Sequence, residues 1–226
     1  MIKDSSARLK EPLQRSTVTD EAAVSQYFSV HPTHPQRRLL VQAADIVRGG
    51  GVIVYPTDST YALGCHIGDK AALDRIREIR RLDMLHHFTL VCRDLSELSI
   101  YARVDNTSFR ILKHYTPGPF TFLLQASREV PRRLVHPKRR TIGIRVPDHV
   151  IAQGLLEALG EPMMSTSLIL PDADEALTDP QEIRDALERR VDLIIDGGAC
   201  GMMATTVVDL TETPPVVIRP GLGVFE

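Results

Sequence analysis

Hydroxyl-bearing and basic side chains recur in this sequence where short apolar runs end. The run from Val52 to Tyr55 stops at Pro56, and the tetrapeptide "TDST" at 57–60 follows at once. Hydroxyl and guanidinium groups donate hydrogen bonds to phosphate and carboxylate oxygens. Because open sheets commonly bind ligands at strand ends, the pattern predicts an anion-binding site, although each stretch alone could be a polar turn that leaves the core. The other stretches of this kind are residues 116–121, Arg145, residues 165–167, Thr205, Thr206 and Arg219.

Signatures of several other chemistries are absent from the sequence. Neither G-x-x-x-x-G-K-[ST] nor G-x-G-x-x-G occurs, so a nucleotide would have to be held without the common phosphate-cradling loops. The 3 cysteines, Cys65, Cys92 and Cys200, show no Cys-x-x-Cys spacing, which predicts free thiols rather than a disulfide framework or a zinc site. His86 and His87 are adjacent, so their side chains diverge in regular structure and we assign no metal-binding residue.

A second candidate region, residues 128–145, is strongly basic and contains a single acid, Glu129. Two interpretations stay open, a solvated basic loop or a surface that faces phosphates or RNA. An aromatic content of 5% without tryptophan argues against recognition of single strands by base stacking. Duplex RNA is recognised mainly through phosphates, 2′-hydroxyls and shape, so a basic surface is sufficient for it. The predicted RNA-binding patch comprises Arg132, Arg133, Lys138, Arg139 and Arg140.

The length and composition of the chain, 226 residues that are 43% hydrophobic, suit one globular domain with a sizeable core. Residues 1–26 are polar and lack sustained periodicity, so we expect a mobile N-terminal extension followed by a single domain at 27–226. No apolar run approaches the roughly 20 residues of a membrane span, and the N-terminus lacks the apolar region of a signal peptide. We therefore expect a soluble cytoplasmic protein with no membrane partner.

Helical and strand-like segments interleave without a strict βαβ rhythm, which predicts a layered α/β domain with a mixed sheet. Apolar positions at helical spacing predict a helix at 35–48 that ends at the glycine run 49–51. Asp69, Asn106 and the T-x-x-Q box at 178–181 are expected to begin further helices, and another spans 150–159. Strands are expected at 52–55, 88–92, 120–124, 141–146, 163–170, 191–196, 205–210 and 215–221.

A series of stretches, in the same order along the chain, resembles the YrdC/YciO superfamily, and the YciO branch is the most similar. These stretches are "GGVIVYPTDSTYALG", "RIREIRRL", "TPGPFTFLL", "TIGIRVP", "MMSTS", "TTVVDL" and "VIRPGLG". The resemblance covers roughly residues 27–226. It implies a three-layer YrdC-like α/β fold in which a strongly twisted mixed sheet surrounds a deep concave cleft.

The best-studied members of this superfamily are threonylcarbamoyl-AMP synthases. These nucleotidyltransferases convert threonine, bicarbonate and ATP to threonylcarbamoyl-AMP and pyrophosphate for tRNA modification. The resemblance thus implies ATP as a substrate with Mg²⁺, and ATP, AMP and threonine or a related small acid as partners. Carried over by position, Arg80 and Ser167 are the catalytic candidates. The candidates for binding substrate and nucleotide are Thr57, Tyr61, Thr116, Thr121, Arg145, Ser165, Thr206 and Arg219.

Two motifs depart from the synthase pattern. Lys-x-Arg becomes "RRL" at 80–82, unless Arg81 serves from a shifted register, and Ser-x-Asn becomes "SLI" at 167–169. Arginine does not replace lysine freely where a compact charge is needed, and isoleucine cannot form the hydrogen bonds of an amide. We therefore expect weak or altered synthase activity. The alternative is a non-catalytic protein that binds double-stranded RNA or tRNA.

Overall fold

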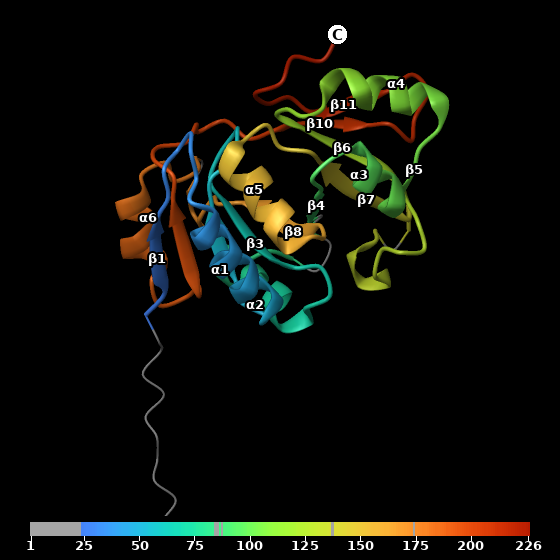
Figure 1. Ribbon diagram of the computed structural model, residues 1–226. Helices are drawn as coiled ribbons and strands as arrows, with labels where there is room; N and C mark the ends of the chain where they lie inside the picture. Colours follow the sequence, from blue (N-terminus) through green and yellow to red (C-terminus); the bar gives the residue numbers. More distant parts are fainter. Residues whose placement is uncertain (1–23, 84–85, 87, 137, 174) are drawn as a thin grey trace, which may run out of the picture.

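The computed structural model describes residues 24–83, 86, 88–136, 138–173 and 175–226 (Figure 1). Within them the chain forms six α-helices and one mixed sheet of 11 strands. The helices are α1 (Arg37–Arg48), α2 (Lys70–Arg80), α3 (Leu95–Tyr101), α4 (Asn106–Tyr115), α5 (Val150–Leu159) and α6 (Pro180–Leu187). The strands are β1 (Gln26–Ser29), β2 (Ile53–Tyr55), β3 (Ala62–His66), β4 (Thr89–Val91), β5 (Ala102–Arg103), β6 (Phe120–Ala126), β7 (Thr141–Arg145), β8 (Met163–Ser167), β9 (Leu193–Asp196), β10 (Thr206–Asp209) and β11 (Val216–Arg219).

The sheet has the strand order β1-β9-β2-β3-β8-β4-β7-β6-β10-β11, and β5 pairs with β6. Parallel pairs, such as β4 with β7 and β6 with β10, occur beside antiparallel pairs, such as β4 with β8 and β6 with β7. This arrangement confirms the mixed α/β sheet that the sequence predicts. It also makes β8, β4, β7, β6 and β10 successive neighbours, although they lie far apart in the chain.

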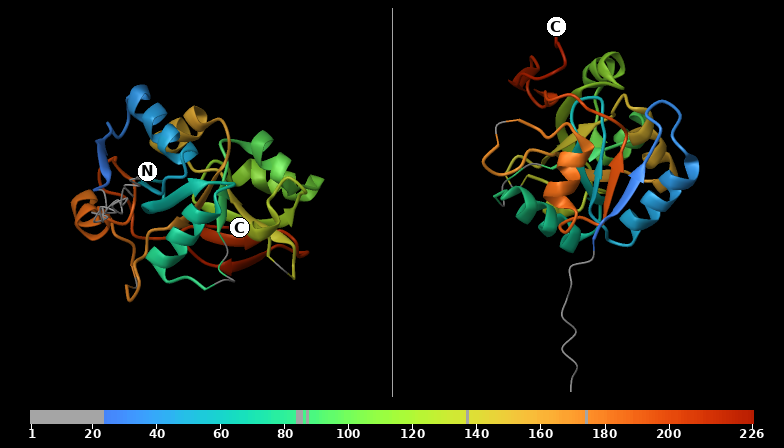
Figure 2. Two further views of the ribbon diagram at one scale, coloured as in Figure 1. Left: turned by 90° about the horizontal axis from the view of Figure 1, so that it is seen from below. Right: turned by 90° about the vertical axis from the view of Figure 1, so that its left-hand side faces the viewer.

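Side chains alternate along a strand, so the central strands present apolar side chains on both faces. Helices cover both of these faces. At β2, Val52 and Val54 pack into one apolar cluster, whereas Ile53 and Tyr55 pack into another. The cluster around Ile53 is closed by α1 and α5, which lie side by side in Figure 2, and the cluster around Val54 is closed by α2 and α6. Two helical layers and the sheet between them form the expected three-layer arrangement.

The boundaries of two helices agree with the sequence expectation. The carboxylate of Asp69 accepts a hydrogen bond from the backbone N–H of Ala72 (2.9 Å) and caps the N-terminus of α2. Helix α5 ends at Gly160, whose φ of 74° lies in the left-handed region that glycine adopts without a steric cost. Both ends follow from local sequence, so they were predictable without knowledge of the tertiary packing.

Two expected N-caps are wrong by one residue. Helix α4 is capped by Asp105, whose carboxylate accepts from the N–H of Ser108, and Asn106 is its first residue. Helix α6 is capped by Asp179, so Thr178 lies outside the cap. Aspartate is at least as good a cap as either neighbour and its charge interacts favourably with the helix dipole. Helix α3 and strands β1, β3 and β5 were not expected from the sequence.

The N-terminal strand β1 begins at Gln26 and pairs in parallel with β9, with Gln26 opposite Leu193. Residues 1–23 lie outside the described residues, so the extension at 1–26 stays a prediction. Among the described helices, none combines the length and the apolar character needed to cross a lipid bilayer.

Replacing Asp69 by alanine should destabilise the protein, because the first turn of α2 loses its side-chain cap. We expect a decrease of about 1 kcal/mol in the free energy of unfolding, measured by urea denaturation. Asp45→Ala is the matched control, since Asp45 forms an exposed ion pair with Arg48 and its loss should cost less than about 0.5 kcal/mol. Equal effects of the two substitutions would contradict the capping role.

Candidate functional site

A pocket of about 390 Å³ opens where the neighbouring strands β8, β4, β7, β6 and β10 meet the ends of α2 and β11. Several predicted site residues line it, although they come from distant parts of the chain. They are Arg80, Thr121, Arg145, Ser165, Ser167 and Arg219. Apolar side chains complete much of the wall, among them Phe88, Val91, Leu123, Ile169, Val207 and Ile218. The pocket therefore offers cations and hydroxyls beside an apolar surface.

Arg145, the last residue of β7, is held beside the pocket by a buried ion pair with Asp58. In the described part of the chain, its hydrogen bonds all leave from Nη2, which donates to Asp58, to Ser59 Oγ (3.0 Å) and to Thr57 Oγ1 (3.5 Å). Only 8% of the Arg145 side chain and 11% of the Asp58 side chain are exposed. These contacts fix one edge of the guanidinium and leave Nη1 for another partner.

The turn at 57–60 satisfies many of its polar groups internally. Thr57 Oγ1 donates to the carbonyl of Thr60 (2.6 Å) and accepts from the backbone N–H groups of Ser59 and Thr60. The Thr57 side chain is buried and is not part of the pocket wall. The stretch is therefore both a polar turn and part of the site. Its hydroxyls hold the turn together, and the turn positions Arg145.

Arg80 and Arg219 face the pocket with neutral partners. Arg80 Nη1 donates to the carbonyl of Ser167, and Arg219 Nη2 donates to the carbonyl of Thr205 (2.9 Å). Burial lowers the pKa of both guanidinium groups, which still carry their charge at neutral pH because the ordinary pKa of arginine is above 12. Asp83 also lines the pocket, so a carboxylate lies in the same wall as these cations.

Hydroxyl groups line the strands between these cations. Ser165 Oγ donates to the carbonyl of Leu63 (3.0 Å) and accepts from the hydroxyl of Tyr55 (2.8 Å). Burial raises the pKa of Tyr55 to about 12, so this phenol remains a neutral donor. On the other side of the pocket, Thr121 and Thr205 share a hydrogen bond between their Oγ1 atoms (2.9 Å). The wall is thus pre-formed by hydrogen bonds within the protein.

Three further predicted residues bond elsewhere and do not line this pocket. The hydroxyl of Tyr61 donates to the carbonyl of Gly198 (2.7 Å). Thr116 Oγ1 donates to the carbonyl of Leu112 (2.7 Å) at the end of α4. Thr206 Oγ1 donates to the carbonyl of Gly223 (2.6 Å). Because adjacent residues of a strand point to opposite faces, Thr205 lines the pocket in place of Thr206.

Sequence reasoning missed Asp58 and Ser59, the partners of Arg145, although both lie in the stretch that it singled out. It also missed Thr89, which lines the pocket, and did not name Thr166, although that residue lies in the stretch 165–167 that it singled out. Thr89 lies opposite Gly143 on β7 and Ser165 on β8, so only the strand register places it at the site. A threonine at the start of a short apolar run was the available signal, and it is too common to be selective.

The two motif departures have different positions in the structure. Arg81 has a φ of 50°, is 73% exposed, and pairs with Asp172 (3.1 Å) away from the pocket wall, so it does not serve from a shifted register. Leu82 packs against the apolar core. Ile169, by contrast, lines the pocket. The departure at 167–169 therefore changes the chemistry of the wall, whereas Leu82 removes a basic group without adding to that wall.

The predicted RNA-binding patch divides in the structure. Arg132 begins a short 3₁₀ helix, and Arg132, Lys138 and Arg140 are exposed. Arg139 instead pairs with Asp209 on β10 (3.6 Å). The side chain of Arg133 lies outside the described residues.

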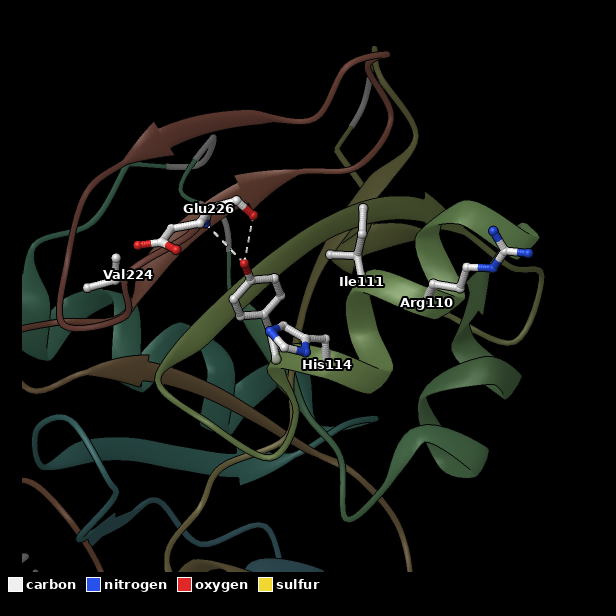
Figure 3. Close-up of a pocket in the computed structure, with 6 residues that line it drawn as sticks. Arg110, Ile111, His114, Val224 and Glu226 are labelled. Carbon is white, nitrogen blue, oxygen red and sulfur yellow. Dashed lines mark hydrogen bonds between the residues drawn. The ribbon is translucent and has the colours of Figure 1, made fainter.

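A shallower pocket of about 490 Å³ lies between α4 and the C-terminal residues (Figure 3). Arg110, Ile111 and His114 come from α4, and the hydroxyl of Tyr115 donates to the carbonyl of Glu226 (2.9 Å). None of the predicted site residues lines it. Over the described residues, no group of three histidine, cysteine or acidic side chains is arranged to hold a metal ion.

Replacing Asp58 by asparagine should destabilise the protein, because Arg145 would remain buried without a counter-charge. Loss of one partner of a buried pair typically costs about 3 kcal/mol or more of the free energy of unfolding. Glu188→Gln is the control, since Glu188 forms a half-exposed pair with Arg184 that should contribute less than about 1 kcal/mol. Thermal or urea unfolding measures both, and similar losses would contradict the special role of Asp58.

Comparisons with known proteins identify the family and the fold of the chain. A family profile described as "Telomere recombination" (Sua5_yciO_yrdC) matches residues 45–221. The "Uncharacterized protein YciO" of Escherichia coli is 61% identical over 200 residues, covering 88% of this chain and 97% of that protein, and its crystal structure superposes with a TM-score of 0.86. The threonylcarbamoyl-AMP synthase of Nitrosococcus oceani is 36% identical over 69% of this chain and 83% of its own length.

A more distant structure also shares the fold. The crystal structure of Pyrococcus abyssi Sua5 complexed with L-threonine has a TM-score of 0.80 and 28% identity, covering 87% of this chain and 58% of that chain. The family profile covers most of the chain, and the identity to YciO extends over nearly all of that relative. The chain therefore belongs to the Sua5/YciO/YrdC family.

Proposed function

We propose that the protein is a nucleotide-using enzyme of the threonylcarbamoyl-AMP synthase type, with weak or altered activity. The observation that carries the proposal is the pair of cations that line one pocket, the partly buried Arg80 and the exposed Arg219, whose hydrogen bonds in the described part of the chain go to neutral oxygen atoms. Removing the charge of Arg80 from water is costly, so the pocket favours an anionic ligand. Arg145 adds a third guanidinium whose position is already fixed. The triphosphate of ATP supplies the required negative charge.

The synthase reaction fits these groups. A carbamate oxygen, formed from threonine and bicarbonate, attacks the α-phosphorus of ATP, and pyrophosphate leaves with the electron pair of the broken P–O bond. Negative charge develops on the phosphoryl oxygens, where fixed guanidinium groups stabilise it without reorganisation. The hydroxyls of Ser165 and Thr121 are held in place by internal hydrogen bonds and provide further polar contacts.

Mg²⁺ carried by the triphosphate is compatible with this donor set. Asp83 is a carboxylate in the pocket wall, and Mg²⁺ at nucleotide sites is usually bound by one or two carboxylates together with the phosphates. The bound ion would neutralise part of the phosphate charge. The pocket thus requires no all-protein metal cage.

Relatives support threonine as the small acid. Sua5 of Pyrococcus abyssi has been solved in complex with L-threonine, and threonylcarbamoyl-AMP synthases of 30–36% identity match this chain. The changed motifs argue for a slower reaction, since the absence of two charge-assisted hydrogen bonds of roughly 1.5–3 kcal/mol each corresponds to about two to four orders of magnitude in rate. A cytoplasmic location and a link to tRNA modification accompany this proposal.

The alternative is a non-catalytic protein that binds double-stranded RNA or tRNA. The exposed basic residues Arg132, Lys138 and Arg140 favour it, because phosphate contacts supply most of the affinity for duplex nucleic acid. Nucleotide chemistry in the pocket and RNA binding at this surface are compatible with each other.

Direct product analysis tests the enzymatic proposal. The protein is incubated with ATP, threonine and bicarbonate, and pyrophosphate release and threonylcarbamoyl-AMP are measured, the latter by mass spectrometry. We expect threonine-dependent formation of both products at a low rate. Binding of ATP without any product would restrict the proposal to nucleotide binding, and the absence of both binding and product would exclude it.

Arg219→Gln should weaken ATP binding about tenfold or more, because a charge-assisted hydrogen bond contributes roughly 1.5–3 kcal/mol. Arg80→Gln should have a similar effect, and isothermal titration calorimetry measures both. Arg81→Gln is the matched control, since Arg81 is the neighbour of Arg80 but lies outside the pocket wall. Equal affinities of all three variants would show that the nucleotide does not contact these cations.

A further inference from the structure

A second basic hollow lies at the opposite end of the β6–β7 pair from the nucleotide pocket. It has a volume of about 580 Å³ and is built from the loop that joins the two strands. Among the described residues, its wall contains no carboxylate. The residues that line it are Ala126, Ser127, Arg128, Val130, Arg132, Val135, His136 and Arg140.

The three arginines of this hollow differ from most others in the protein. The side chains of Arg128, Arg132 and Arg140 form no hydrogen bond or ion pair in the described part of the chain, and all three are exposed. By contrast, many other arginines pair with carboxylates. These are Arg48, Arg75, Arg77, Arg81, Arg93, Arg139, Arg145 and Arg184. Three guanidinium groups around one hollow thus remain available to a ligand.

The backbone that carries these arginines is well fixed. The N–H of Arg140 donates to the carbonyl of His136 (2.9 Å), and the N–H of His136 donates to the carbonyl of Thr141 (2.9 Å). The carbonyl of Arg140 accepts from the N–H of Ala126 (2.9 Å), which ties the loop to β6. Ser127 Oγ donates to the carbonyl of Ile100 (2.7 Å). Backbone hydrogen bonds therefore hold the described residues that carry these arginines in place.

We propose that this hollow binds phosphate groups. Guanidinium is always charged and its fork of donors matches phosphate oxygens, so three of them around a hollow without acids favour a multiply charged phosphate over a single carboxylate. Phenylalanine, tyrosine and tryptophan are absent from the described wall, so a base would not be read by stacking there. The phosphates come either from an RNA duplex or from a free polyphosphate, and the site is the same in both cases.

The site extends the predicted patch and changes its membership. Arg128 joins it, whereas Arg139 is directed to Asp209 on β10 by an ion pair. If the phosphates come from RNA, the proposal rests on the RNA-binding alternative given under Proposed function. It does not depend on the nucleotide pocket. Arg140 precedes β7 and Arg145 ends it, so at roughly 3.4 Å per residue the two sites lie about 17 Å apart.

The test compares two triple variants of the full chain with equal loss of charge. The first is Arg128→Gln, Arg132→Gln and Arg140→Gln. The matched control is Arg37→Gln, Arg38→Gln and Arg189→Gln, because these arginines are also exposed and form no side-chain pair in the described residues. Binding of a short double-stranded RNA is measured by fluorescence anisotropy at several salt concentrations, and binding of pyrophosphate by calorimetry. Unchanged thermal unfolding verifies that both variants are folded.

We expect the hollow variant to lose at least tenfold in affinity for one of the two probes, and the control variant to stay within twofold of the wild type. For RNA, the slope of log affinity against log salt should decrease by about 0.9 for each phosphate that the variant no longer neutralises. Loss of RNA binding alone identifies a nucleic acid as the source of the phosphates, and loss of pyrophosphate binding alone identifies a small ligand.

Two outcomes would overturn the proposal. One is equal loss in both triple variants, which would mean a general effect of net charge, and the other is no measurable binding of either probe to the wild type. Arg219→Gln separates the two sites, because it should leave RNA binding unchanged whether or not the nucleotide pocket is active. Failure at the hollow therefore leaves the enzymatic proposal intact.

Discussion

The buried ion pair between Arg145 and Asp58 is the contact on which the shape of the pocket lined by β8, β4, β7, β6 and β10 depends. It joins the end of β7 to the turn after β2, although β3, β8 and β4 lie between these strands. In a flat sheet, four strand spacings would separate β2 from β7 by about 19 Å. The twist of the sheet and the inward fold of the turn at 57–60 must therefore act together to bring the two side chains into contact. The concave surface follows from that requirement.

The guanidinium groups of the pocket are of two kinds, one with a carboxylate partner and two with neutral partners. Arg145 is compensated by Asp58 and immobilised, so it contributes orientation more than net charge. In the described part of the chain, Arg80 and Arg219 donate to neutral oxygen atoms, so they contribute positive potential. The apolar Ile169 in the wall leaves the cations of the pocket in place.

Sequence patterns predicted the family, the mixed sheet and the strand ends that meet at the pocket, because each strand is a short apolar run that local signals terminate. They did not separate hydroxyls that face the pocket from those that bond inward. Thr116 reaches the carbonyl of Leu112 four residues earlier, and Thr206 reaches Gly223, so only the tertiary structure shows that these donors are already used. The choice between Thr205 and Thr206 depends on which face of β10 meets the pocket, which one sequence does not reveal. The predicted N-caps were wrong where two good capping residues are adjacent in the sequence.

The paired strands β6 and β7 also set the distance between the two basic sites. Its strands are hydrogen-bonded along their length, from Phe122 opposite Ile144 to Gln125 opposite Thr141, so the distance between its ends is not adjustable. At roughly 3.4 Å per stacked nucleotide, the separation of about 17 Å corresponds to about five nucleotides of one strand. A single mononucleotide is too short to occupy both ends at once. Small ligands at the two ends would therefore be separate molecules, and a substitution at one end can change one site without the other.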